Sequence, residues 1–156
     1  MIRSHIEIDR TPTEVFAYVA DLDRHCEWQD AIISARKVPA GPTRLGTHNF
    51  ETRRLPGGPR EVESEIYEYE PPRRIAAKGV NGPVRATIVI SIEPLDGASR
   101  SRLTTELTLE GRGIGRLLLP LARRVARKQV PRDQLRLKHI LESGQAVPAS
   151  APAAAE

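Results

Sequence analysis

Four histidines, His5, His25, His48 and His139, are the residues of this sequence best suited to acid–base or metal chemistry. They are scattered, and no two have the HxH or HExxH spacing typical of a metal site, so no metal is expected. Cys26 directly follows His25, and adjacent side chains point apart, which disfavours a Cys–His nucleophilic pair. The sequence also lacks the glycine-rich nucleotide loops and the nucleophile elbow, so no cofactor is expected.

His48 is the strongest catalytic candidate of the four. It has the same strand parity as Phe50, which places both side chains on the presumed inner face of a sheet. A histidine there could donate a proton to a bound carbonyl compound or take one from it. A histidine that is only hydrogen-bonded at a sheet edge is the alternative, and the sequence leaves both open.

Composition indicates one globular domain. Of 156 residues, 39% are hydrophobic and 28% charged, and the single cysteine excludes an internal disulfide. No apolar stretch approaches the ~20 residues that span a bilayer. No signal-type apolar run follows Met1, and we therefore expect a cytoplasmic protein without a membrane span.

The net charge of +4 is concentrated near the C-terminus. Arginine and lysine recur through residues 112–138, and this basic segment could meet nucleic acid or an anionic membrane, or could form a solvated helix face. Only 4% of the residues are aromatic, which leaves little for base stacking, so nucleic acid is not the expected partner.

The order of elements begins with a strand that runs into a capped helix. Residues 2–8 alternate between apolar and polar, and Thr11-Pro-Thr-Glu14 forms a capping box for a helix that ends near Asp21. A second short helical turn leads to Trp28. Turn signals then separate six further predicted strands, at residues 31–38, 47–54, 61–69, 74–80, 84–93 and 100–109.

A long amphipathic helix follows the last strand and reaches Leu141. Pro131 lies inside this pattern and predicts a kink or break, and Gly144 is the expected C-cap. The domain therefore spans residues 1–144, and the Ala- and Pro-rich residues 145–156 are expected to form a disordered tail. Strands flanked by helices at both ends indicate an α+β fold in which the last helix covers the apolar face of an antiparallel meander.

Small residues on the presumed inner face suggest either a pocket or a close approach of the helix. Ser64, Ala77 and Ala86 remove volume where a packed core would have larger side chains. Trp28 could close over a ligand or seal the core. Ser64 and Thr105 could orient a polar ligand group or bond to neighbouring strand residues. The residues leave these alternatives open.

Several segments together resemble a known family. They are Ile6–Phe16, Glu27-Trp28, the Glu68–Ile75 segment EYEPPRRI, the Ser101–Leu107 segment SRLTTEL and the Leu135–Glu142 segment LRLKHILE. Their order and spacing resemble the polyketide cyclase/dehydrase and lipid-transport family of the START-like (Bet v 1-like, SRPBCC) superfamily. The resemblance implies a helix-grip fold, in which a curved seven-stranded antiparallel sheet wraps around a long C-terminal helix. It also implies two short helices after the first strand and a hydrophobic cavity.

The leading functional expectation is the binding, or transport, of a hydrophobic small molecule such as a polyketide, lipid or isoprenoid. A polyketide cyclase or dehydratase acting in the same cavity, with His48 moving protons, is the alternative. A regulatory module whose basic helix binds an acidic partner is a third hypothesis. Either a monomer or a homodimer fits the sequence. The expected ligand contacts are Trp28, His48, Phe50, Ser64, Ile66, Ala77, Ile88, Ile90, Thr105, Leu107, Leu118 and Leu121.

Overall fold

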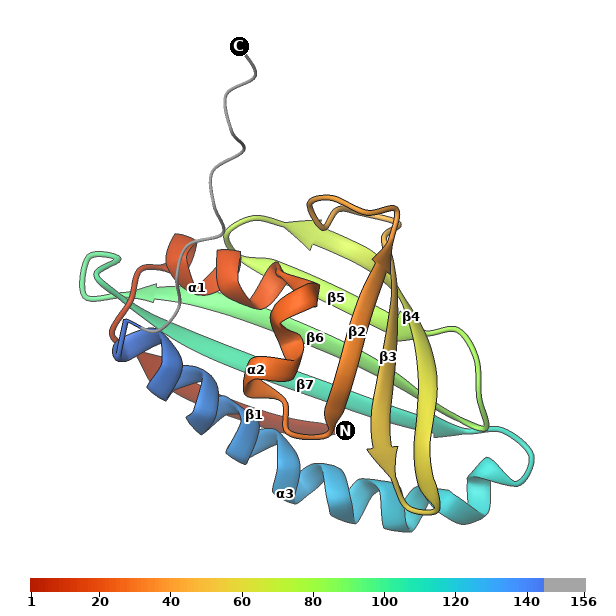
Figure 1. Ribbon diagram of the computed structural model, residues 1–156. Helices are drawn as coiled ribbons and strands as arrows, with labels where there is room; N and C mark the ends of the chain where they lie inside the picture. Colours follow the sequence, from red (N-terminus) through yellow and green to blue (C-terminus); the bar gives the residue numbers. More distant parts are fainter. Residues whose placement is uncertain (145–156) are drawn as a thin grey trace.

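A curved antiparallel sheet and a long helix dominate the computed structural model, which describes residues 1–144 (Figure 1). The seven strands have the order β1-β7-β6-β5-β4-β3-β2. All predicted strands and helices are present, with ends shifted by a few residues, and the expected helix-grip fold is confirmed. The elements are β1 Ile2–Ile8, α1 Pro12–Ala20, the 3-10 helix η1 Leu22–Arg24, α2 His25–Trp28, β2 Ile32–Val38, β3 His48–Leu55, β4 Gly58–Glu70, β5 Arg74–Gly79, β6 Val84–Leu95, β7 Arg100–Gly111 and α3 Gly115–Glu142.

The turn from β1 into α1 is fixed by the predicted capping box. The Thr11 hydroxyl accepts a hydrogen bond from the Glu14 amide at 3.3 Å, and the Glu14 carboxylate accepts one from the Thr11 amide at 3.0 Å. Both amides would otherwise lack a partner inside the helix. The helix then buries Val15, Phe16 and Val19 against the inner face of the sheet.

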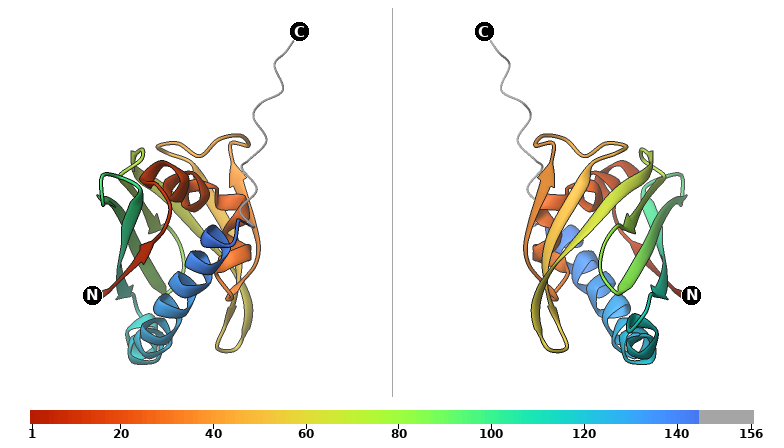
Figure 2. Two further views of the ribbon diagram at one scale, coloured as in Figure 1. Left: turned by 90° about the vertical axis from the view of Figure 1, so that its left-hand side faces the viewer. Right: turned by 90° about the vertical axis from the view of Figure 1, so that its right-hand side faces the viewer.

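The sheet is a meander that bends into a trough. Each strand from β2 to β7 pairs with its sequence neighbour, and β1 joins the free edge of β7. Register shifts occur in β2 between Ile32 and Ser34 and in β4 between Ile66 and Glu68, and such bulges increase local bending. Figure 2 shows α3 lying in the trough between the two sides of the sheet.

One end of the trough is packed solid. There, α1, η1, α2 and the second half of α3 meet the sheet, and the core includes Trp28, Ile66, Ile90, Leu103 and Leu137. At the other end, α3 begins against the β5–β6 loop. A Cβ on Gly115 would lie 1.9 Å from the carbonyl oxygen of Pro83, so only glycine fits at this crossing.

Helix α3 is continuous, so a break at Pro131 is ruled out, and of the two predicted outcomes only a kink stays a prediction. The helix runs from Gly115 to Glu142 with Pro120 and Pro131 inside it, and both prolines are exposed. Gly144 has a positive φ of 72° just after the C-cap Ser143, in keeping with its predicted role at the helix end. Among residues 1–144, no helix is both long and apolar enough to cross a bilayer. The predicted tail at 145–156 lies outside the described residues.

Candidate ligand-binding site

Burial of the inner face changes along the strands. On β6, Ile92 and Ile90 are buried, whereas Ile88 and Ala86, next along the same face, are partly exposed. Burial also decreases in this direction along the inner face of the neighbouring strand β7. The inner faces of β4 and β5 show the same decrease. The trough therefore has a closed end, filled by the core, and an open end. The inward-facing residues of the open end are Val62, Ser64, Ala77, Gly79, Ala86, Ile88, Leu107 and Leu109.

The first half of α3 leaves apolar side chains uncovered beside this open end. The helix packs on β1, β7 and, less extensively, β6. Leu118, Leu121 and Val125 follow one another at helical spacing, and each is 40–48% exposed. An apolar helix flank next to a partly exposed apolar sheet face is the arrangement expected of a site for an apolar ligand.

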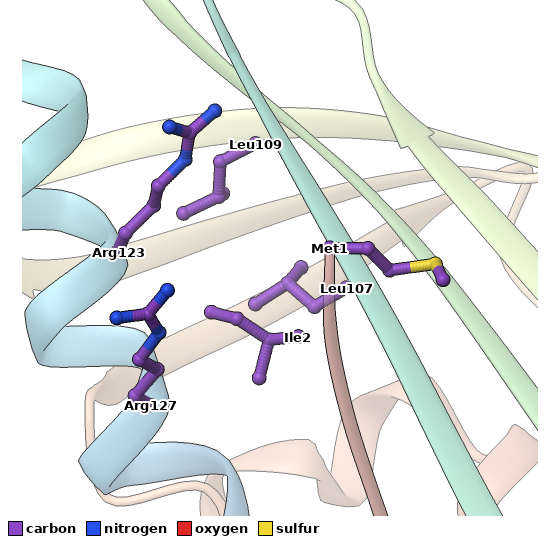
Figure 3. A pocket seen from close by; sticks show the side chains of 6 residues that line it. All are labelled: Met1, Ile2, Leu107, Leu109, Arg123 and Arg127. Carbon is purple, nitrogen blue, oxygen red and sulfur yellow. The ribbon is translucent and has the colours of Figure 1, made fainter.

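A pocket of about 180 Å³ lies where α3 crosses β1 and β7 (Figure 3). Ile2, Leu107 and Leu109 form its apolar floor, and the side chains of Arg123 and Arg127 extend over it from α3. Ligand pockets for drug-sized molecules are typically about 300–1,000 Å³. By itself, this pocket therefore has room for only part of such a molecule.

A polar cluster occupies the inner face of β3, where α2 packs against it. The Glu51 carboxylate lies 3.2 Å from His25 Nδ1 and 3.2 Å from Arg53 Nε, and it accepts a 2.7 Å hydrogen bond from the Asn49 amide. Arg53 in turn donates to Gln29 Oε1 at 2.7 Å. Burial tends to raise the pKa of Glu51, but hydrogen bonding by His25 and the charge of Arg53 outweigh it and lower that pKa to about 2. The Glu51 carboxylate is therefore ionised and held in place.

Two polar atoms next to this cluster are buried without a hydrogen-bond partner. They are Trp28 Nε1 and Asn49 Oδ1. The Trp28 ring contacts His25 edge-on with centroids 5.4 Å apart, and Asn49 already uses its amide nitrogen on Glu51. Buried polar groups are rarely left unpaired, so a donor and an acceptor are available here for a water or for a polar ligand group.

Asp133 is the group on α3 whose protonation the fold alters most. Its carboxylate is half-buried and accepts a 3.4 Å hydrogen bond from the Asp30 amide. Burial raises the pKa of Asp133 to about 6, although this hydrogen bond and the nearby Arg53 oppose the shift. An inward-facing carboxyl with this pKa can exchange a proton near neutral pH.

The predicted inward orientation of His48 and Phe50 is wrong. In β3 the residues that face the trough are Asn49, Glu51 and Arg53, because α2 brings polar partners to that side. His48 faces outward and its Nδ1 lies 2.8 Å from the Glu63 carboxylate. Phe50 is also outside, with the guanidinium of its strand partner Arg36 4.0 Å from the ring centroid. Strand parity alone could not choose between the two alternating sets.

The other predicted residues lie on the inner side of the sheet or on α3. Ile66, Ile90 and Trp28 belong to the closed core, so Trp28 does not cover a cavity mouth. Thr105 is buried and accepts a 3.0 Å hydrogen bond from Gln134, which also bonds to Ser4 and so attaches α3 to β1 and β7. The remaining predicted contacts, at or beside the open end, are Ser64, Ala77, Ile88, Leu107, Leu118 and Leu121.

Sequence comparison agrees with the fold. A family model described as polyketide cyclase/dehydrase and lipid transport matches residues 2–142. The chain belongs to this family. The match covers every strand and helix that forms the trough, so the open end is part of a polyketide cyclase/lipid-transport family domain. Among curated protein sequences, none matches this family member.

Solved structures of the same fold are similar in shape but distant in sequence. A START superfamily protein from Mycobacterium smegmatis is 14% identical with a TM-score of 0.74, over 91% of this chain and 97% of that chain. DR_A0006 from Deinococcus radiodurans is 20% identical with a TM-score of 0.68, over 92% and 98%. The di-domain ARO/CYC BexL from the BE-7585A biosynthetic pathway is 18% identical with a TM-score of 0.73, over 93% of this chain and 47% of that chain. At these identities, the likeness establishes the fold of this family member and nothing about its ligand.

Proposed function

We propose that this protein binds a hydrophobic small molecule at the open end of its trough. The observation that carries the proposal is the change of burial along β6 and β7. Ile90 and Ile92 are sealed by the helices, whereas Ile88 and Leu107 on the same face remain partly exposed. Apolar surface of this kind is stabilised when a ligand covers it, at about 25 cal/mol per Å². The family description, which includes lipid transport, supports the same proposal.

The ligand in this proposal has one polar end. Asn49 Oδ1 would supply an acceptor for it, because this atom has no protein partner and Asn49 pairs in the sheet with Ser64 of the open end. A single hydroxyl group near it, on an otherwise apolar skeleton, would satisfy the unpaired oxygen and leave the rest to the apolar face. Polyketides, isoprenoids and lipids all include molecules of this description.

An occlusion experiment tests the proposal. Ala86→Phe places a ring on the open inner face, and Thr87→Phe, one residue along, places the same ring on the outer face. Binding would be followed by displacement of the apolar dye 1-anilinonaphthalene-8-sulfonate and by native mass spectrometry of co-purified molecules. We expect Ala86→Phe to weaken dye binding about tenfold, equivalent to ~1.4 kcal/mol, and Thr87→Phe to leave it unchanged. Equal binding by both variants and the wild type would refute the proposed site.

A cyclase or dehydratase is the second candidate, and Asp133 is the observation that favours it. A carboxyl with a pKa of about 6 can act as acid or base near neutral pH, and Arg53 is close enough to influence it. This role replaces the one expected of His48, which faces outward. Conversion of a linear poly-β-carbonyl thioester, lost in Asp133→Asn while ligand binding persists, would favour the enzyme. If the wild type shows no turnover, the enzyme proposal fails and only the binding proposal remains.

A further inference from the structure

The first half of α3 exposes more large apolar side chains than any other part of the described chain. Five of the twelve exposed large hydrophobic residues within 1–144 fall between Ile114 and Val125. Leu117 is 80% exposed and Ile114 69%. Isolated exposed apolar residues are ordinary, but a contiguous group on one short segment indicates an interaction surface. We call this group the apolar ridge; it consists of Ile114, Leu117, Leu118, Leu121 and Val125.

The same segment is basic throughout. No aspartate or glutamate occurs between Glu110 and Asp133, whereas seven arginines and lysines do. Within residues 1–144, the side-chain ion pairs of α3 come from Arg136 and Lys138, near its end, and none involves these seven. The basic group flanks the apolar ridge, and its members are Arg112, Arg116, Arg123, Arg124, Arg127, Lys128 and Arg132.

Helix geometry places part of each group on the side away from the sheet, whereas Leu118 and Val125 lie on the flank beside the trough and Arg123 lies on the other flank, over β1 and β7. At 3.6 residues per turn, Leu117, Leu121 and Arg124 lie roughly opposite the side on which Ala122 and Ala126 pack toward the strands. All three outer residues are exposed, and both alanines are partly buried. An exposed helix face that combines leucines with arginines and lysines has the composition of helices that lie in a membrane interface.

We propose that the first half of α3 docks on the surface of an anionic lipid bilayer. The apolar ridge would enter the boundary between headgroups and acyl chains, and the basic group would contact lipid phosphates. Arg123 and Arg127, which already extend over an apolar pocket floor of Ile2, Leu107 and Leu109, would hold headgroups at the edge of the contact (Figure 3). The helix would lie along the surface and would not cross it.

Charge favours a bilayer over the other occupants of such a surface. In a two-fold dimer through the apolar ridge, the same arginines from both copies would meet, and like charges would repel. Nucleic acid would use the charges but not the leucines, and within residues 112–128 there is no aromatic residue on which bases could stack. An anionic lipid surface is complementary to the leucines and to the arginines at once.

Vesicle sedimentation of the full chain tests the proposal. Phosphatidylcholine vesicles would be compared with vesicles that contain about 30% phosphatidylglycerol, at low and at physiological salt. We expect binding only to the anionic vesicles, with at least a tenfold loss in Arg123→Glu/Arg124→Glu/Arg127→Glu. Ile114→Ser/Leu117→Ser should lose a similar amount, although its charge is unchanged. Both variants alter exposed residues, and circular dichroism would confirm that they fold.

The matched control reverses two cations at the other end of the molecule. Arg44 and Arg73 are exposed and lie in the β2–β3 loop and the β4–β5 turn, far from the start of α3 (Figure 1). Arg44→Glu/Arg73→Glu should bind anionic vesicles as the wild type does. Equal loss in this control, or no vesicle binding by the wild type, would overturn the proposal, as would a dimer that forms through the apolar ridge. Binding to duplex DNA in place of vesicles would also overturn it. The assay measures attachment to the vesicle surface, which does not require the trough to hold a molecule, so its failure would leave the proposed ligand site untouched.

Discussion

The Glu51 carboxylate and the His25 imidazole lie 3.2 Å apart and join the inner face of β3 to the short helix α2. The other ring nitrogen of His25, Nε2, lies 2.8 Å from the backbone oxygen of Val19 at the end of α1. Each ring nitrogen of His25 therefore lies within hydrogen-bond distance of an oxygen atom. Through this one pair, α1, α2 and β3 are held together beside the candidate site.

Replacement of Glu51 by glutamine should destabilise the protein at neutral pH. The variant removes the charge that pairs with His25 and Arg53, and we expect a loss of about 2–3 kcal/mol in the free energy of unfolding. A group whose pKa is lowered on folding stabilises the fold above its unfolded pKa of 4.5, and that stabilisation disappears as the pH falls toward 2. Urea unfolding of both proteins between pH 7 and pH 3 would measure the difference, which should shrink with acidification.

The control for this prediction lies on the outer face of the sheet. Glu63 pairs with His48 at 2.8 Å in a more exposed setting, with 39% of the His48 side chain accessible. Glu63→Gln should therefore change the free energy of unfolding by less than about 1 kcal/mol. A Glu51→Gln variant as stable as Glu63→Gln would contradict the structural role given to the inner pair.

Asp133→Asn should make the protein more stable at neutral pH. Burial raises the pKa of this carboxyl from 3.8 to about 6, so the folded state favours its protonated form. That preference stabilises the fold below pH 3.8 and is lost as the pH rises through 6. Because the carboxyl is only half-buried, solvent screening reduces the effect, and we expect a gain of ~1 kcal/mol at pH 7. Thermal melts at pH 4 and pH 7.5 would check this prediction. The variant should be more stable than the wild type at pH 7.5 and no more stable at pH 4.

Gln134→Ala should weaken the attachment of α3 to the sheet. The Gln134 amide donates to Thr105 Oγ1 at 3.0 Å and accepts from Ser4 Oγ at 2.7 Å, and the residue is buried. Truncation leaves both hydroxyls without their partner and creates a gap. Together these two effects typically lower the free energy of unfolding by about 2–4 kcal/mol. Chemical denaturation would measure the loss, with the exposed Arg132→Ala as the helix control. Equal stability of the two variants would show that α3 is held by its apolar contacts alone.

His48→Ala should leave ligand binding unchanged. The side chain points away from the trough and contacts Glu63 on the outer face, so its removal affects only an exposed ion pair worth ~0–1 kcal/mol. Dye displacement by the variant and the wild type, at equal protein concentration, would check this. Tenfold weaker binding in His48→Ala would return this residue to the site and argue that β3 has the opposite orientation.

The fold could be predicted from the sequence because its signals are local. The capping box at Thr11, the alternation within strands and the turn residues between them each act over a few residues. The orientation of β3 could not be predicted, since it depends on His25 and Gln29 arriving from α2. A rule that places apolar residues inside favours Phe50, but here a paired charged set occupies the interior. Pro131 does not break the helix, because an exposed helix face tolerates the missing amide donor.

The candidate site itself was predictable only in part. Small residues at Ala77 and Ala86 correctly indicated the face that lines the trough. Which end of the face stays open depends on where α3 crosses the strands, and no local pattern encodes that crossing. Asp133 was overlooked for the same reason, because its environment is created by the Asp30 turn 103 positions earlier in the chain.

The division of each central strand into a sealed and an open portion has a consequence for how this protein could change over generations. Substitutions at Ile90, Ile92 or Leu103 disturb the packing on which folding depends, whereas those at Ala86, Ile88 or Leu109 alter a surface that folding does not require to be filled. A lineage, or a mutant library, can therefore explore new ligands at one end of β6 and β7 while the other end keeps the scaffold intact. Diversification limited to those open positions should yield a high fraction of folded variants.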